Sequence, residues 1–392
     1  MKINSIYVGG WFQRTMLQLS EIYDFLRDCK TQLDLSTEKL SEYRKALQIG
    51  KIDYGVAGEE YVEFTTAVNI RVRVFEDGLI TLKNESVSED TLFADIEHVT
   101  DYYENKLSPA FSYLFSLGAP VPKELAHIET VYPYFIVCDN ATKDEIADLL
   151  ARTEKQKYFE FVNDKYDVIR GDKYYFINNK KQSLDKIERY IEEQVFIREF
   201  KGQLHRYLNI HRIIWEKIDA VKEQANVKGA DIVKFSSKLE GYAKTINLID
   251  GRINQMSTYL PTREKIAKSD EELAEFLAIS GYRYETLKDT LDYIKSLWTM
   301  TKNYVSSAQK LFDGLRSQIT EKSVDNLTIV TSMGVGASLI GLFTESAPSF
   351  TVFGVVYFFA LALVGWLVNK IMSTISKKRK YEVADIEYDK DI

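Results

Sequence analysis

Polar side chains recur at a regular spacing near the end of this 392-residue chain. Thr331, Ser338 and Glu345 follow one another at seven-residue intervals, with Gly334 and Gly341 between them. On a helix this spacing places all five residues on one face. Repeated around an axis by several subunits, such a face lines a cation pathway, and Glu345, the candidate metal-binding residue, forms a carboxylate ring at its mouth. The alternative is a helix-packing face, on which small residues permit close approach and hydroxyls bond back to their own backbone.

Two uncharged segments must position these residues. They are 327–343 and 350–368, and the link between them, 344–349, has only six residues. Each segment is close to the roughly 17–25 residues that a helix needs to cross a bilayer. The sequence therefore predicts two transmembrane helices joined by a short outer loop. A pair of buried helices in a soluble core is the alternative, although such helices are seldom apolar on every face.

The charges around these segments predict their orientation. The link carries only Glu345, whereas the tail at 369–392 begins with Lys370 and continues with a basic cluster at 377–380 before an acidic end. Positively charged flanks stay on the cytoplasmic side of a membrane. We therefore expect a cell-membrane protein whose N-terminal body and C-terminal tail are both cytoplasmic.

The first 182 residues mix strand and helix signals and predict an α+β domain. Ile3–Val8 has strand character, and Gly9-Gly10 after it is interpreted as a turn. Asp77-Gly78 lies between two segments rich in β-branched residues and predicts a hairpin. A helix is expected at 142–152, with Thr142 as its N-cap.

Residues 183–268 predict an antiparallel pair of helices, the second of which ends at Pro261. The second helix has apolar residues at every position of a heptad seam: Ile232, Phe235, Leu239, Tyr242, Ile246, Ile249, Ile253, Met256 and Leu260.

Residues 269–326 predict a long stalk helix that continues into the first transmembrane segment. Its seam is apolar except at Ser280 and Thr301, and no proline occurs between Pro261 and Pro348. A rod of this length needs neighbours along its whole course, which predicts a homo-oligomer. Separate helices broken at Gly281 or Gly314 are the alternative.

The composition excludes several classes of protein. A net charge of −7, with no basic stripe outside the tail, argues against a nucleic-acid partner. Cys29 and Cys138 are the only cysteines, so neither a disulfide framework nor a metal spacing is present. Acidic pairs such as Glu59-Glu60 and Glu192-Glu193 are interpreted as solvated faces. With no nucleophile pattern or phosphate loop, we expect neither an enzyme nor a bound cofactor.

This layout resembles the CorA family of divalent-metal transporters. Members carry Gly-Met-Asn at the outer end of the first span, commonly followed by Glu and Pro. Here Gly341, Glu345 and Pro348 fall in register, but Leu342 and Phe343 replace methionine and asparagine.

The resemblance implies a homopentamer in the lipid bilayer that passes Mg²⁺, with Co²⁺ or Ni²⁺ as further ions. Thr331, Gly334 and Ser338 would line the conduit, and Glu345 would attract cations at the mouth. Phe343 offers no oxygen ligand, so hydrated Mg²⁺ is not recognised there as in the family. The alternative is a membrane-anchored cytosolic sensor or effector on the same scaffold. The expected fold is therefore an α+β cytosolic domain, a long helical stalk and a C-terminal two-helix transmembrane hairpin.

Overall fold

The computed structural model describes most of the chain up to Phe343 and parts of the rest. The described ranges are 1–11, 17–57, 59–115, 134–153, 156–222, 226–269, 271, 274, 284–343, 356, 359, 363–364, 366–368, 370–371, 374–375 and 378–382. Within 322–343 the helical backbone is described, together with the side chains of Val324, Thr328, Thr331 and Ser332.

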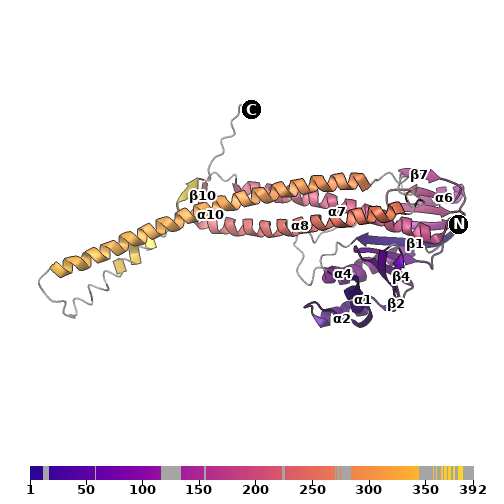
Figure 1. Cartoon of the computed structure of the whole chain (residues 1–392), viewed down its shortest axis with the longest axis horizontal. Helices are drawn as coiled ribbons and strands as arrows, with labels where there is room; N and C mark the ends of the chain where they lie inside the picture. Colours follow the sequence, from indigo (N-terminus) through magenta and orange to yellow (C-terminus); the bar gives the residue numbers. More distant parts are fainter. Residues whose placement is uncertain are drawn as a thin grey trace, which may run out of the picture. The chain divides into compact units, whose positions relative to one another are not determined.

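A mixed β-sheet forms the centre of the N-terminal part (Figure 1). In the described residues it has nine strands in the order β2-β3-β4-β5-β1-β6-β9-β8-β7, and β6 and β9 are its one parallel pair. The strands are β1 (Lys2–Trp11), β2 (Ile49–Ala57), β3 (Glu59–Thr66), β4 (Ile70–Phe75), β5 (Leu79–Asn84), β6 (Tyr134–Asp139), β7 (Phe159–Val162), β8 (Tyr166–Arg170) and β9 (Tyr174–Asn179).

Short helices bury one face of this sheet. They are α1 (Leu19–Asp28), α2 (Thr37–Ala46), α3 (Leu92–Tyr102), the π-helical turn η1 (Tyr103–Leu107), α4 (Ser108–Phe115) and α6 (Lys143–Thr153). One apolar core joins α1, α2, η1 and α4 to β1, β3, β4 and β5. A second core joins α3 and α6 to β1, β6, β8 and β9. The capping prediction is confirmed, because Thr142 Oγ1 accepts from the Glu145 amide while the Glu145 carboxylate accepts from the Thr142 amide.

Two glycine predictions have opposite outcomes. Gly78 has a φ of 91° between β4 and β5, so the Asp-Gly hairpin is confirmed. Gly9 and Gly10, predicted to form a turn, instead lie inside β1. A Cβ on Gly9 would stand 2.9 Å from Val195 Cγ1, so the absence of a side chain lets a helix approach this strand closely.

Three long helices follow the sheet: α7 (Leu184–Lys222), α8 (Gly229–Ser269) and α10 (Tyr284–Phe343). Pro261 does not end the second helix as predicted, because α8 continues through it to Ser269. Proline removes one helical hydrogen bond. The turn beyond it is held by Arg263, whose side chain is buried in ion pairs.

The chain divides into two compact units. Unit 1 comprises Met1–Leu208 and Asp250–Lys295, and unit 2 comprises Asn209–Ile249 and Ser296–Ile392. In unit 2, Trp215 of α7 stacks on Tyr304 of α10 with centroids 4.4 Å apart, and Phe235 of α8 contacts Phe312 of α10 at 5.8 Å. The three helices therefore pack along their apolar seams.

The described seam residues are buried as the heptads predict, except Phe235, Tyr242 and Ile319, which are half-buried. Ile232, Leu239, Ile246 and Ile249 of α8 are fully buried, as are Ala308 and Phe312 of α10. No break occurs at Gly314. Gly281, the other predicted breakpoint, lies outside the described residues.

The predicted α+β domain followed by long helices is confirmed. Within the described part of the chain, none of the helices combines the length and the apolar character that a membrane span requires. The loop at 344–349 lies outside the described residues, as does much of 350–368.

Candidate functional site

The predicted conduit residues lie near the end of one helix. Thr331, Gly334 and Ser338 belong to the last third of α10, and their spacing places them on one face of its backbone. Gly341, Leu342 and Phe343 are among its last residues; of these six residues, only the Thr331 side chain is described, and it is exposed. Glu345 and Pro348 lie outside the described residues.

Two hydroxyls in this part of α10 bond to their own helix. Thr328 Oγ1 donates to the Val324 carbonyl at 3.0 Å, and Ser332 Oγ donates to the Thr328 carbonyl at 2.8 Å. Both side chains are exposed. Such back-bonding satisfies a hydroxyl in an apolar environment. Neither residue belongs to the stripe from Thr331 to Glu345, so the conduit and its packing alternative both stay predictions.

Large apolar side chains are exposed between residues 356 and 375. Trp366 is 58% exposed, and the Lys370 ammonium lies 4.7 Å from its ring centroid. The other exposed residues are Val356, Phe359, Leu363, Val364, Leu367, Val368, Ile371 and Ile375. Exposed apolar side chains of this size and number are typical of a segment that contacts lipid or another protein.

A strand pair ties the tail back to the helices of unit 2. β10 (Asn226–Lys228), between α7 and α8, pairs antiparallel with β11 (Lys380–Glu382) (Figure 1). Val227 and Tyr381 are register partners and both are buried. The Gly229 amide also donates to the Arg379 carbonyl at 3.1 Å. Strands of three residues leave no periodic signal, so sequence reasoning missed this pair.

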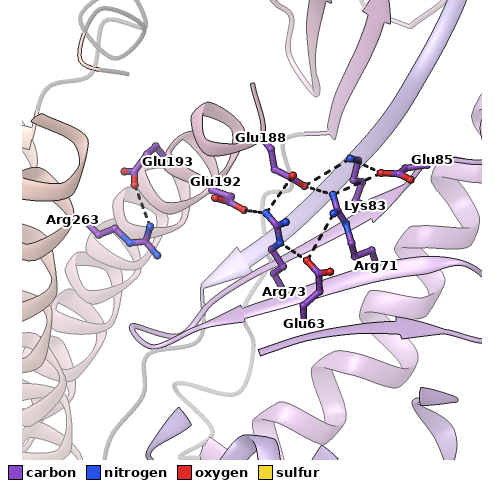
Figure 2. Close-up of polar contacts among 9 residues, drawn as sticks. All are labelled: Glu63, Arg71, Arg73, Lys83, Glu85, Glu188, Glu192, Glu193 and Arg263. Carbon is purple, nitrogen blue, oxygen red and sulfur yellow. Dashed lines mark hydrogen bonds and ion pairs between the residues drawn. The ribbon is translucent and has the colours of Figure 1, made fainter. Parts of the chain in front are cut away.

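Unit 1 contains a buried ionic network that sequence reasoning also missed (Figure 2). Glu188 of α7 lies 2.6 Å from Arg71 Nη2 and 3.3 Å from Arg73 Nη1, both on β4. Arg73 further contacts Glu192 at 3.2 Å and Glu63 at 2.6 Å. The network joins the open face of the sheet to α7, and Glu85 completes it by pairing with Lys83.

Arg263 of α8 is the centre of a second set of ion pairs. Its guanidinium lies 2.7 Å from Asp77 and 3.1 Å from Glu193, and it is bidentate to Asp77. Glu59 Oε2 is 2.7 Å away, although this contact is too poorly aligned for a hydrogen bond. Tyr284 of α10 donates to Glu193 at 2.5 Å. Arg263 thus links α8 to the β4–β5 turn and to α7, and Glu193 extends this link to α10, all within unit 1.

Burial shifts these carboxyl groups toward the neutral form. It raises the pKa of Glu59 to about 8 and that of Glu192 to about 7, while Arg263 and Arg73 respectively oppose the shift. Burial also raises the pKa of Glu193, opposed first by Arg263. These ion pairs join the sheet to the long helices within unit 1.

The interpretation of Glu192-Glu193 as a solvated face is wrong, because Glu192 is 5% exposed and Glu193 is 2% exposed. Glu59 is likewise mostly buried. Their spacing offered a signal: Glu188 and Glu192 are four residues apart on a helix whose neighbouring positions, Ile187 and Ile191, are apolar.

His211 lies among aromatic rings in unit 2. It stacks on Trp215 with centroids 5.9 Å apart and meets the edge of Trp298 at 5.8 Å. Burial lowers its pKa. Over the described residues, no group of three or more His, Cys, Asp or Glu side chains could hold a metal ion. Cys29 and Cys138 are free thiols.

No protein-family model and no curated protein matches the chain. Among solved structures, the chain is similar to the CorA magnesium transporter from Methanocaldococcus jannaschii. The match covers 65% of this chain and 93% of the transporter, at 10% identity and a TM-score of 0.29. At that TM-score the superposition is too loose to carry an argument about this chain.

Proposed function

We propose that this chain is one subunit of a CorA-like, homo-oligomeric membrane channel for divalent cations. Mg²⁺ is the leading ion, with Co²⁺ and Ni²⁺ as further candidates. Thr331, Gly334 and Ser338 line the conduit, and Glu345 attracts cations at the outer mouth. The proposal rests on the ordered sequence features, on the α+β domain followed by long helices, and on the contacts of the C-terminal segment.

The strand pair β10–β11 is the observation that supports the proposal most. After α10 ends at Phe343, the chain returns by Lys380 to pair with Asn226–Lys228 of the same unit. A chain that leaves and returns to one compartment crosses a membrane an even number of times. Two crossings, at 327–343 and 350–368, meet this condition, and they agree with the charge distribution around the two segments.

The exposed apolar residues between 356 and 375 give independent support. Phe359, Leu363 and Trp366 are each 58–66% exposed, which is costly in water for side chains of this size. Lipid or neighbouring subunits would cover them. Trp366 and Lys370 follow the pattern of a membrane interface, where an aromatic ring and a lysine occur at the level of the headgroups.

One sequence feature favours a second candidate function. Leu342 and Phe343 stand where CorA proteins carry methionine and asparagine, so the mouth lacks the amide associated with hydrated Mg²⁺. The second candidate is therefore a membrane-anchored sensor or effector. Its α+β domain would bind a cytosolic ligand, and the protein would not conduct ions.

Flux measurements separate the two candidates. The full chain is reconstituted into liposomes loaded with a metal-sensitive dye, and Mg²⁺, Co²⁺ or Ni²⁺ is added outside under an inward-negative potential. We expect dye signal for at least one of these ions and a particle mass near five times 45.3 kDa in detergent. No signal for any of the three ions contradicts the channel and leaves the sensor.

Glu345→Ala is the site-specific test. Removing a carboxylate ring lowers the local cation concentration at the mouth, so we expect flux to fall by roughly tenfold. Glu38→Ala, which removes an exposed carboxylate from α2, is the matched control and should leave flux unchanged. Equal flux in Glu345→Ala and wild type would remove the proposed role of Glu345.

A further inference from the structure

Apolar and cationic side chains form two neighbouring rows on the segment from Trp366 to Arg379, in unit 2. The described residues between 366 and 378 are helical, and the Arg379 amide donates to the Ile375 carbonyl at 2.9 Å. On a helix, residues four apart lie one above the other. One row is Leu367, Ile371 and Ile375, and the row beside it is Lys370, Thr374 and Lys378.

Two shallow pockets follow these rows. The first, with a volume of ≈ 390 Å³, is lined among the described residues by Trp366, Leu367, Lys370, Ile371, Thr374 and Ile375. The second, of ≈ 560 Å³, is lined by Thr374, Ile375, Lys378 and Arg379. Because two residues line both pockets, the pockets adjoin, and we call them together the 366–379 groove. Its first part is mainly apolar, and its second part is mainly cationic.

The apolar row continues past residue 368, where the second predicted membrane segment ends. Ile371 is 50% exposed and Ile375 is 61% exposed. Side chains of this size are unfavourable in water. The row therefore fits an occupant that brings apolar surface of its own to this part of the groove.

The cationic part of the groove can hold an anion. Lys370, Lys378 and Arg379 are exposed, and in the described part of the chain none of them forms an ion pair with a carboxylate. The Lys370 ammonium lies 4.7 Å from the Trp366 ring centroid. The Thr374 hydroxyl donates to the Lys370 carbonyl at 2.8 Å, so the donors left for an anion are the lysines and the arginine.

The strand pair β10–β11 brings further positive charge to the same end. Lys228 of β10 is the register partner of Lys380 of β11, which directly follows Arg379. The Gly229 amide donates to the Arg379 carbonyl, which holds the two segments together here. Like charges directly opposite each other in a strand pair are unfavourable. An anion bound nearby would offset this repulsion.

We propose that the 366–379 groove binds an anionic glycerophospholipid, with an acyl chain along the apolar row and the phosphate at Lys378 and Arg379. A guanidinium group binds phosphate oxygens through paired hydrogen bonds, and lysine adds a compact positive charge. A second copy of the same face would set cations against cations, which disfavours it as the occupant. The inference rests on the membrane location in the proposed function, and it does not depend on ion conduction.

Quenching of Trp366 by brominated lipids tests the groove. The full chain is reconstituted into phosphatidylcholine vesicles that contain equal mole fractions of either brominated phosphatidylglycerol or brominated phosphatidylcholine. The difference between wild type and Trp366→Phe gives the signal of this one tryptophan. We expect the anionic lipid to associate roughly fivefold more tightly than phosphatidylcholine.

The possible results separate this site from the channel. Equal quenching by the two lipids overturns the lipid site and leaves the channel untouched. Quenching by neither lipid overturns the site and also contradicts the transmembrane hairpin. Loss of the preference on addition of inorganic phosphate would identify a soluble anion as the occupant and would overturn the lipid proposal.

Variants locate the lipid phosphate. Lys378→Gln and Arg379→Gln, made separately, should each reduce the preference for phosphatidylglycerol to about half or less. Lys228→Gln is the matched control, because it removes the same charge from an exposed lysine that is not among the residues lining the groove. It should keep most of the preference. Equal losses in all three variants would mean that the general positive charge of the tail attracts the lipid, which contradicts a site in the groove.

Discussion

Arg263 is a charged residue buried among charged partners in unit 1. Its side chain is 3% exposed and pairs with Asp77 and Glu193, whose side chains are 5% and 3% exposed. A buried pair contributes little relative to well-packed apolar residues, but removing one partner leaves the others charged and unpaired. We therefore expect truncation of the Arg263 side chain to lower the free energy of unfolding strongly.

Arg263→Met should lower the free energy of unfolding by about 3–5 kcal/mol, because Asp77 and Glu193 lose their cation. Thermal melting of the full chain, followed by tryptophan fluorescence, measures the change. Lys244→Gln removes an exposed partner of Glu240 and should melt with the wild type. Equal melting of all three proteins would mean that the Arg263 ion pairs contribute nothing to stability.

Glu199 predicts a dependence of stability on pH. Burial raises the pKa of the Glu199 carboxyl group to about 8 in the folded protein, from an ordinary value of 4.5. Between these two pH values the folded state binds the proton more tightly than the unfolded state does. The contribution of Glu199 to the free energy of unfolding is therefore greatest at the low end of this pH range and falls as the pH rises toward 8. Between pH 6 and 7.5 the loss from this group is at most roughly 2 kcal/mol.

Glu199→Gln should remove this component, because glutamine stays neutral throughout. The difference in melting temperature between wild type and variant, measured at pH 6 and at pH 8, tests it. The variant should gain relative stability at the higher pH. A difference that is the same at both pH values would contradict the raised pKa.

The strand pair β10–β11 has only three residues in each strand, yet it joins two segments that are far apart in the sequence. It fixes Lys380–Glu382 to Asn226–Lys228, which lies between α7 and α8, within unit 2. Its three register pairs are supported by the Gly229 amide and by burial of Val227 and Tyr381. A substitution pair can test the register directly.

Val227→Cys together with Tyr381→Cys should form an intramolecular disulfide under mild oxidation. Direct partners in an antiparallel pair have Cα atoms about 4.5–5.5 Å apart, which suits a disulfide. Asn226→Cys with Lys380→Cys is the control, since these positions are not partners and should cross-link poorly. Mobility on a non-reducing gel reports the bond; equal cross-linking of both pairs would argue against this register.

At the scale of the whole molecule, the proposal requires both ends of the chain on one side of a membrane. The sequence supplies the two uncharged segments, and unit 2 supplies the strand pair that returns the tail. Neither observation depends on how the two units are arranged.

Ser346→Cys and Asp385→Cys, made separately on a Cys29→Ser background, should react with a membrane-impermeant label from opposite sides of the bilayer. Cys138 can remain, because burial raises its pKa to about 12 and keeps the thiol neutral. Labelling in sealed vesicles of known orientation is the measurement. Reaction of both positions from the same side would contradict the transmembrane hairpin.

Features that repeat over a few residues could be predicted from the amino-acid sequence. Strand alternation around Asp77-Gly78, the Thr142 cap and the heptads of α8 and α10 are set by neighbours a few residues apart, so their periods are visible without the fold. The uncharged segments and the stripe from Thr331 to Glu345 have the same local origin, and the conduit they suggest remains a prediction.

The pairing of residues far apart in the chain could not be predicted from the sequence and became visible in the fold. Arg263 pairs with Asp77 across 186 positions and with Glu193 across 70, and these contacts bury carboxylates whose local pattern suggested a solvated face. The same contacts hold the turn that follows Pro261. A helical period is visible in the local sequence, but the burial of a charged side chain depends on which other elements pack around it. Burying a charge costs desolvation free energy, and an oppositely charged side chain from a distant part of the chain offsets that cost.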